Sequence, residues 1–158
     1  MHRAIQLTLF SQFFFSFFLL VFVFSLVDPC HQYETLNSSD RNINNSESRD
    51  DKLCDDHRLP SSPNAWYRFQ GAAGTRLPTE CPPSKRCHTD YPGWLNVKHK
   101  PLPPEGVTEE SMKVCFGFYD ETDCCAQSIF IHIKNCSSYF VYKLFSTPKC
   151  SLRYCGTG

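Results

Sequence analysis

The sequence predicts a small, mostly β, loop-rich module that is stabilised by disulfides, with a central β-hairpin after the Cys124-Cys125 pair. Three observations lead to this fold class. The chain has ten cysteines in 158 residues, its apolar segments are short and alternate in the manner of strands, and its proline-rich connections exclude long helices. A module with a limited core commonly depends on covalent links for part of its stability.

Residues 1–27 differ in composition from the rest of the chain. His2 and Arg3 give a weakly basic start, and Phe13 to Val27 is almost wholly apolar. We interpret residues 1–27 as a secretory signal peptide, because a polar, cysteine-bearing sequence follows directly and favours removal and export. The alternative is an uncleaved membrane anchor, since about 20 apolar residues can span a bilayer. The module is expected over residues 28–158, with its core over 30–155, and we expect it to be secreted.

The segment from residue 31 to residue 53 is polar and lacks periodicity, so we expect a long exposed loop there. It contains two acceptor sequences for N-linked glycans, Asn37-Ser38-Ser39 and Asn44-Asn45-Ser46. The alternative is a solvated loop that is never modified.

The alternation of aromatic residues predicts a strand over Ala65 to Phe69, which is followed by a glycine-rich turn. Trp66 and Arg68 share one face of this strand, and Tyr67 and Phe69 share the other. One interpretation is core packing beside disulfides, which large aromatic residues favour in a small module. The other is an aromatic platform for a ligand.

Residues 75–106 contain seven prolines, which predict loop and edge strand rather than helix. Trp94-Leu95 is one short apolar insertion in this region. Val107 to Cys115 fits either a helical turn or a short strand, because the segment is too short to decide between them.

Two alternating segments predict the central hairpin. In the first, the isoleucines at 129, 131 and 133 alternate with Phe130, His132 and Lys134, and the second runs from Tyr139 to Leu144. Cys136-Ser137-Ser138 is typical of the turn between them. Neighbouring residues on a strand point to opposite faces, so the adjacent cysteines at the head of the hairpin are expected to bond to different partners.

The sequence predicts no enzyme and no cofactor. It lacks a G-x-S-x-G elbow, and its histidines are scattered without the spacing of a catalytic group, at His31, His57, His88, His99 and His132. Cys81 and Cys87-His88 have the ligand types of a zinc site but not the paired spacing, and export favours disulfides over thiolates. The acidic runs Asp50-Asp51, Asp55-Asp56 and Asp120-Glu121-Thr122-Asp123 are interpreted as solvated turns rather than calcium loops.

The equal numbers of basic and acidic residues limit the classes of partner that we expect. Sixteen basic residues face sixteen acidic ones, which argues against a nucleic-acid-binding surface and against a polybasic membrane patch. We expect an extracellular protein or glycan as the ligand, no nucleic acid, and no membrane contact after removal of the signal.

A series of short motifs resembles a known family. Along the chain they are Asp28-Pro29-Cys30, Trp66-Tyr67-Arg68-Phe69, Gly74-Thr75-Arg76, Cys81 with Arg86-Cys87, Trp94-Leu95, Cys124-Cys125, Lys134-Asn135-Cys136, Tyr139-Phe140-Val141-Tyr142, Pro148 with Cys150, and Tyr154-Cys155. The series closely resembles the eight- or ten-cysteine extracellular module of uromodulin and of the pancreatic zymogen-granule membrane glycoprotein. The resemblance covers nearly the whole chain after residue 27.

The resemblance implies a non-enzymatic, β-rich module with five bridges. The implied pairs are Cys30 with Cys136, Cys54 with Cys150, Cys81 with Cys124, Cys87 with Cys155, and Cys115 with Cys125. In the family, a mannose-rich glycan on the hairpin captures bacterial fimbrial lectins. Lys143 stands at the position of the glycan-bearing asparagine, so the resemblance does not carry that decoy function to this chain. We also expect the zona-pellucida region to be missing, since the sequence stops three residues past Cys155.

A third acceptor sequence, Asn135-Cys136-Ser137, lies on the hairpin itself, where the cysteine is an awkward middle residue. Glycans are therefore expected on Asn37, Asn44 or Asn135. Our leading hypothesis is a secreted, non-catalytic recognition module. The alternatives are a structural spacer or a fragment of a larger matrix or zona-pellucida-type protein, and, more remotely, an inhibitor of secreted hydrolases.

Overall fold

The computed structural model describes residues 28–46, 52–57, 59–117 and 124–158. The chain forms two compact units, residues 1–32 and 33–158. The proposed signal peptide, Asp50-Asp51 and the acidic run 120–123 lie outside the described residues. Within the described ranges, no helix is both long enough and apolar enough to cross a membrane.

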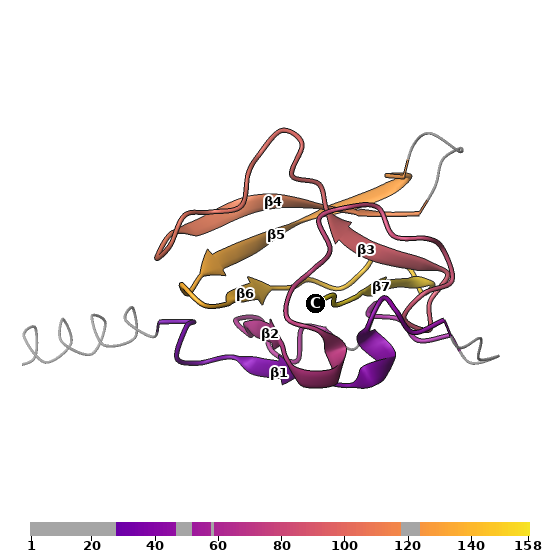
Figure 1. Cartoon of the computed structure of the whole chain (residues 1–158), viewed down its shortest axis with the longest axis horizontal. Helices are drawn as coiled ribbons and strands as arrows, with labels where there is room; N and C mark the ends of the chain where they lie inside the picture. The colour runs from indigo at the N-terminus through magenta and orange to yellow at the C-terminus, as the bar shows by residue number, and fades with distance from the viewer. Residues whose placement is uncertain (1–27, 47–51, 58, 118–123) are drawn as a thin grey trace, which may run out of the picture. The chain divides into compact units, whose positions relative to one another are not determined.

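The second unit is built on one seven-stranded sheet, and only two short 3-10 helices accompany the strands in its described part. The strands are β1 (Glu34–Leu36), β2 (Tyr67–Phe69), β3 (Tyr91–Leu95), β4 (Thr108–Phe116), β5 (Gln127–Asn135), β6 (Phe140–Lys143) and β7 (Leu152–Tyr154), and the helices are η1 (Ser39–Arg41) and η2 (Gly71–Ala73). The strand order is β1-β2-β6-β5-β4-β3-β7. Pairs β1/β2 and β3/β7 are parallel and the others are antiparallel. Figure 1 shows the sheet curling across the unit, and the mostly β fold class is confirmed.

The predicted hairpin is the centre of this sheet. β5 and β6 pair in antiparallel register from His132 opposite Lys143 to Asn135 opposite Phe140. The turn between the strands includes Ser137 with a positive φ of 69°. Branched and aromatic side chains fit such a half-buried pleated surface well, and the alternation in the sequence therefore predicted the correct strands.

The core lies on the inner face of the sheet. Its largest fully buried side chains come from six of the seven strands and from the segments that flank them: Tyr67, Phe69, Leu77, Leu95, Met112, Phe116, Ile131, Ile133, Tyr142, Leu144, Leu152 and Tyr154. Tyr67 and Phe69 are each 1 % exposed, so core packing is the correct interpretation for this face of the aromatic strand.

One expectation about local structure needs correction, and the structure decides one alternative that the sequence left open. The segment from residue 31 to residue 53 is not simply an exposed loop, because it supplies β1, which pairs with β2, and η1, whose Arg41 is buried. The undecided segment Val107 to Cys115 is strand rather than helix. It pairs with β5 along most of its length, and this tertiary pairing outweighs the helix propensity of its glutamate, methionine and lysine residues.

The last residues of the chain are packed into the unit. Gly156 bridges to Asn42 in parallel and Thr157 bridges to Arg76 in antiparallel fashion. A Cβ at Gly156 would collide with the backbone oxygen of Ala73 and would lie 2.8 Å from a ring carbon of Phe69. Only glycine fits here, since the neighbouring backbone occupies the place of any side chain.

Candidate binding face and its buried support

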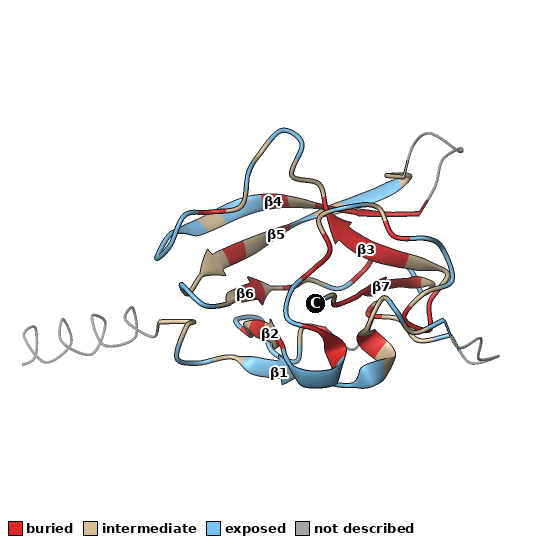
Figure 2. Ribbon diagram, in the orientation of Figure 1, coloured by how far each residue is buried: buried red, intermediate tan, exposed pale blue. Residues whose placement is uncertain are grey.

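The side chains on the far side of the sheet from the core form a contiguous surface over β2, β6, β5 and β4. The buried residues Tyr67, Tyr142, Ile131 and Ile133 point inward, so their alternate neighbours point outward. We call this surface the outer face; it comprises Trp66, Arg68, Lys113, Phe130, His132, Lys134, Lys143 and Phe145. Figure 2 shows exposed and half-buried residues along the outer parts of β4 and β5. Phe130, at 58 % exposed, is the most exposed large apolar residue among those the structure describes.

Three rings form the middle of the outer face. The ring centroids of Trp66 and His132 are 6.5 Å apart with the rings perpendicular, and those of His132 and Phe145 are 5.7 Å apart. All three residues are half-buried. The first contact is edge-to-face and the second is tilted at 56°. Ring contacts at these distances are favourable, so the rings support one another while part of each remains open to solvent.

Arg68 is a cation without an acidic partner among the described residues. Its guanidinium lies 3.7 Å from the ring centroid of Tyr139 and 5.6 Å from that of Tyr33. One terminal nitrogen donates a hydrogen bond of 2.8 Å to the Tyr33 hydroxyl, whereas the buried Nε has no hydrogen-bond partner among the described residues. The two tyrosines hold the guanidinium by cation–π contact, and no acid in the described ranges neutralises its charge.

The lysines on β4 and β6 add to this charge. Lys113 lies opposite Phe130, and the Lys143 ammonium donates to the neutral Asn64 side chain at 3.3 Å. Neither lysine forms an ion pair with a described residue. Two acids of the neighbouring strands are bound elsewhere. Glu34 accepts a hydrogen bond from Ser61, and Glu109 accepts one from Lys100, which lowers the pKa of that carboxyl.

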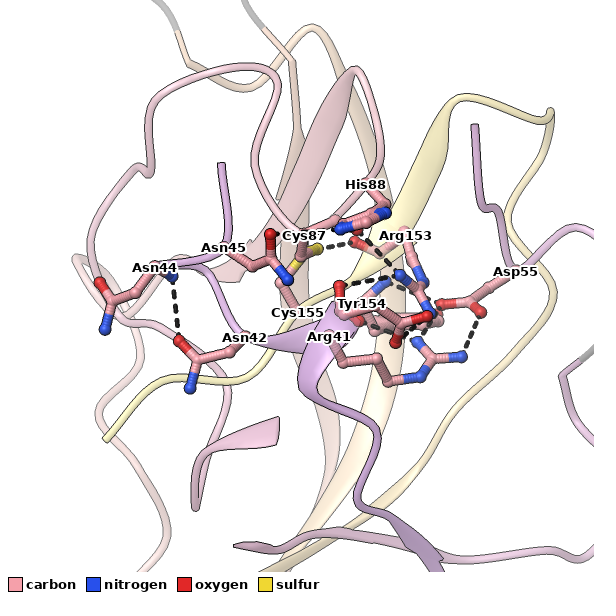
Figure 3. The surroundings of a disulfide bond; sticks show 11 residues. Arg41, Asn42, Asn44, Asn45, Asp55, Cys87, His88, Arg153, Tyr154 and Cys155 are labelled. Carbon is pink, nitrogen blue, oxygen red and sulfur yellow. Dashed lines mark hydrogen bonds and ion pairs between the residues drawn. A yellow bond between two sulfur atoms is a disulfide. The ribbon is translucent and has the colours of Figure 1, made fainter. Parts of the chain in front are cut away.

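A buried ion pair packs against β7, the end strand of the sheet, beside the Cys87–Cys155 disulfide (Figure 3). Arg41 donates to both carboxylate oxygens of Asp55, at 2.9 Å and 2.7 Å, and also to the Tyr154 carbonyl at 3.0 Å. Asp55 also accepts the Tyr154 backbone N–H at 2.9 Å and is fully buried. The interpretation of Asp55 as part of a solvated turn is therefore wrong. Three donors converge on its carboxylate, which compensates its loss of hydration.

A second arginine extends the network. Arg153 of β7 donates to the carboxylate of Asp40 at 3.1 Å, to the Asp40 carbonyl at 3.0 Å and to the Cys87 carbonyl at 2.9 Å. Burial acts to raise the pKa of Asp40, but hydrogen bonding from Ser38 and the positive charge of Arg153 outweigh it, and the net pKa is lowered. Burial is also the largest cause that lowers the pKa of Arg153. The network joins η1 to β7, and we assign it a structural role. The sequence pattern contained no signal for it, because its members are isolated charges in aperiodic segments.

All ten cysteines are disulfide-bonded. The structure joins Cys54 to Cys150, Cys81 to Cys124, Cys87 to Cys155 and Cys115 to Cys125, with Cα–Cα distances of 5.1, 6.2, 6.1 and 4.7 Å. These are the pairs that the family resemblance implies, and Cys124 and Cys125 have different partners. The pairing of Cys30 with Cys136 stays a prediction.

The candidate metal ligands are committed to other bonds. Cys81 and Cys87 lie in separate disulfides, so neither offers the thiolate that zinc requires. The histidine beside them, His88, is buried and lies 3.2 Å from the Asn45 side-chain oxygen (Figure 3). In the part of the chain that the structure describes, one trio of possible ligands comes together, Cys54, Asp56 and Cys150. Its two cysteines are bonded to each other.

The three glycan acceptor sequences differ in their surroundings. Asn37 and Asn44 are exposed. Asn135 is half-buried, and its side-chain nitrogen, the atom that a glycan would occupy, donates to the Pro103 carbonyl at 3.0 Å. The side-chain oxygen of Asn135 accepts the Ser137 backbone N–H at 3.0 Å. The side chain of Asn135 therefore already has a role in holding the hairpin turn.

Comparison with known proteins places these features in a family context. The family model of the uromodulin-like domain matches residues 67–156. The chain is 39 % identical over 129 residues to the pancreatic secretory granule membrane major glycoprotein GP2 of Canis lupus familiaris, covering 81 % of this chain and 23 % of that protein. It is 36 % identical over 129 residues to GP2 of Homo sapiens, covering 81 % of this chain and 22 % of that protein. It is also 36 % identical over 129 residues to uromodulin of Mus musculus, covering 81 % and 18 %. The chain thus spans about a fifth of the length of these relatives.

Proposed function

The chain belongs to the uromodulin-like domain family, and from this membership we propose that it is a non-catalytic recognition module that binds its ligand through the outer face. It is an extracellular, disulfide-bonded module, in keeping with glycoprotein relatives. The names of the relatives state no activity that transfers to this chain.

The observation that carries the proposal is the outer face itself. It is a contiguous surface of three half-buried rings, one exposed Phe130 and several cations, on strands that the sheet and the disulfides hold in place. A surface of this kind suits recognition, because aromatic and arginine side chains supply much of the binding energy at interfaces. Central strands β5 and β6 pair on both sides, so a ligand would meet side chains rather than unpaired backbone.

We further propose that N-linked glycans are carried by Asn37 and Asn44 and not by Asn135. The first two side chains are exposed on the segment around η1, whereas the nitrogen of Asn135 is engaged by Pro103. Mass spectrometry of glycopeptides from the secreted protein checks this assignment. Occupancy at Asn135 equal to that at Asn37 would contradict it.

The test of the recognition proposal compares two exposed apolar residues. Phe130 lies on the outer face and is 58 % exposed, while Val107 precedes β4 and is 44 % exposed. The oxidised, secreted chain is labelled, and its binding to intact cells and to extracellular matrix is measured by flow cytometry and solid-phase assay. We expect Phe130→Ser to reduce binding several-fold and Val107→Ser to leave it unchanged.

Two results would refute the proposal. If Phe130→Ser binds cells and matrix as the wild-type chain does, the outer face is not the surface through which the chain binds them. If the wild-type chain binds no cell or matrix, a spacer role is favoured instead. Urea midpoints close to that of the wild-type chain show that each variant remains folded.

A further inference from the structure

We infer that the ligand of the outer face is a sulfated polysaccharide; this inference rests on the proposed function of that face as a binding surface. The chain as a whole has no net charge, yet Arg68, Lys113 and Lys143 lie on one face without an acidic partner among the described residues. Two acids of the neighbouring strands are bound elsewhere, because Glu34 is hydrogen-bonded to Ser61 and Glu109 is paired with Lys100. The exposed acid of β4 is Glu110. Among the described residues, the outer face therefore carries unpaired positive charge, which favours an anionic ligand.

The spacing of these cations favours a polymer with repeated charges. Lys113 is on β4, Lys143 on β6 and Arg68 on β2, so β5 separates the first two. Strands lie about 4.8 Å apart and residues on one face about 6.6 Å apart, which places neighbouring cations roughly 8–12 Å from one another. A single terminal sialic acid would reach only one of them. A chain that carries sulfate groups on successive sugars would reach all three at once.

The rings between the cations favour sugar over an acidic peptide. Trp66, Phe145 and Phe130 present partly open aromatic surfaces next to Lys113 and Lys143. The C–H faces of sugar rings pack on such surfaces, while their charged substituents meet the lysines. An extended peptide gains much of its affinity from main-chain bonds to a sheet edge, and the face of β5 and β6 offers no such edge, since both strands are paired on either side.

Arg68 adds a fixed donor to this surface. Its position is set by the two tyrosine rings and by the hydrogen bond to Tyr33. A guanidinium that is already held in place loses little freedom when it binds an oxyanion. We therefore place one sulfate group near Arg68 and the next near Lys143.

The experiment measures binding of the oxidised chain to immobilised heparin, to unsulfated hyaluronan and to polyglutamate, over a range of salt concentrations. The wild-type chain is expected to bind heparin at least 10-fold more tightly than the other two polymers. Lys113→Ala/Lys143→Ala is expected to lower heparin affinity about 5-fold or more, as the loss of two charge contacts from partly exposed lysines predicts. Release of counterions predicts that the salt dependence becomes shallower by about two in log–log slope.

The matched control also removes two lysines. Lys52 and Lys85 are both exposed and both contact Asp90, outside the outer face: the Lys52 ammonium lies 2.7 Å from its carboxylate, and the Lys85 N–H donates to its carbonyl. Lys52→Ala/Lys85→Ala should retain the wild-type affinity for heparin. Phe130→Ser should weaken heparin binding without changing the salt slope.

The outcomes separate the ligand class from the proposed function. If Lys52→Ala/Lys85→Ala loses as much heparin affinity as Lys113→Ala/Lys143→Ala, heparin binds by general charge attraction and the inference is wrong. If polyglutamate binds as tightly as heparin, the ligand class is an acidic peptide and the inference is also wrong. If no polymer binds but Phe130→Ser still reduces cell binding, the sulfated-polysaccharide class is wrong and the outer face remains the binding surface. If heparin binding depends on Lys113 and Lys143 while cell binding does not depend on Phe130, the inference stands and the proposed route to cell recognition fails.

Discussion

Replacing Asp55 should lower the free energy of unfolding by more than the loss of any exposed ion pair in the described part of the module. Its carboxylate accepts two hydrogen bonds from Arg41 and one from the Tyr154 backbone. Asp55→Ala leaves the guanidinium of Arg41, a residue that is 8 % exposed, without its counter-ion and leaves the Tyr154 N–H without an acceptor. Breaking one side of a buried pair typically costs about 3–5 kcal/mol. This is a large part of the roughly 5–15 kcal/mol by which a domain is stable.

Urea denaturation of the oxidised chain measures this loss. With an m-value of about 2 kcal/mol/M, a loss of about 4 kcal/mol lowers the midpoint by about 2 M. Lys52→Ala is the control, because the Lys52–Asp90 pair has the same 2.7 Å separation as the closest Arg41–Asp55 contact but a lysine that is 55 % exposed. Exposed pairs are worth about 0–1 kcal/mol. A loss below about 1 kcal/mol for Asp55→Ala, or equal losses for both variants, would refute the assignment of the network as structural support.

Three further predictions concern the same framework. The lowered pKa of Asp40 means that its ionised form stabilises the module above the carboxyl's ordinary pKa and that this contribution is lost as the pH falls through the lowered value. Urea midpoints measured from pH 7 to pH 2 should therefore fall at the acid end, and Asp40→Asn should flatten that fall; an unchanged pH profile would exclude Asp40 as its source. Gly156→Ala should reduce stability by about 2 kcal/mol or more, because its methyl group meets the backbone of Ala73, and a thermal midpoint equal to that of the wild-type chain would contradict this. Peptide mapping without reduction should recover Cys124 and Cys125 in separate bridges and join Cys30 to Cys136; a peptide in which Cys124 is bonded to Cys125 would rule out the framework.

Lys143 connects the family resemblance to the outer face. It lies where the family resemblance places a glycan-bearing asparagine, and the structure puts it opposite His132 on the hairpin. An asparagine with its glycan at this position would stand opposite His132. With lysine in its place, this part of the outer face is not covered by a glycan at that position. The hairpin is therefore both the scaffold of the sheet and the centre of the proposed binding surface.

The sequence by itself determined the elements whose signals are local. The alternation of Ile129, Ile131 and Ile133 is a property of adjacent residues, and it predicted the hairpin and the inward face correctly. The aromatic strand around Tyr67 followed from the same period. The adjacency of Cys124 and Cys125 likewise predicted two different partners, and the structure gives them as Cys81 and Cys115, with both adjacent cysteines lying just before β5.

Only the tertiary structure decided the features that join distant segments. Arg41 and Asp55 are 14 residues apart, and Arg153 is 113 residues from Asp40. An isolated charge in a polar segment looks the same to a sequence pattern whether it is solvated or buried against a partner. The free energy of burying a charge depends on the donors that surround it in space, and those donors come from segments that only the folded sheet brings together. The outer face follows the same rule, since its four basic residues, Arg68, Lys113, Lys134 and Lys143, come from four different strands.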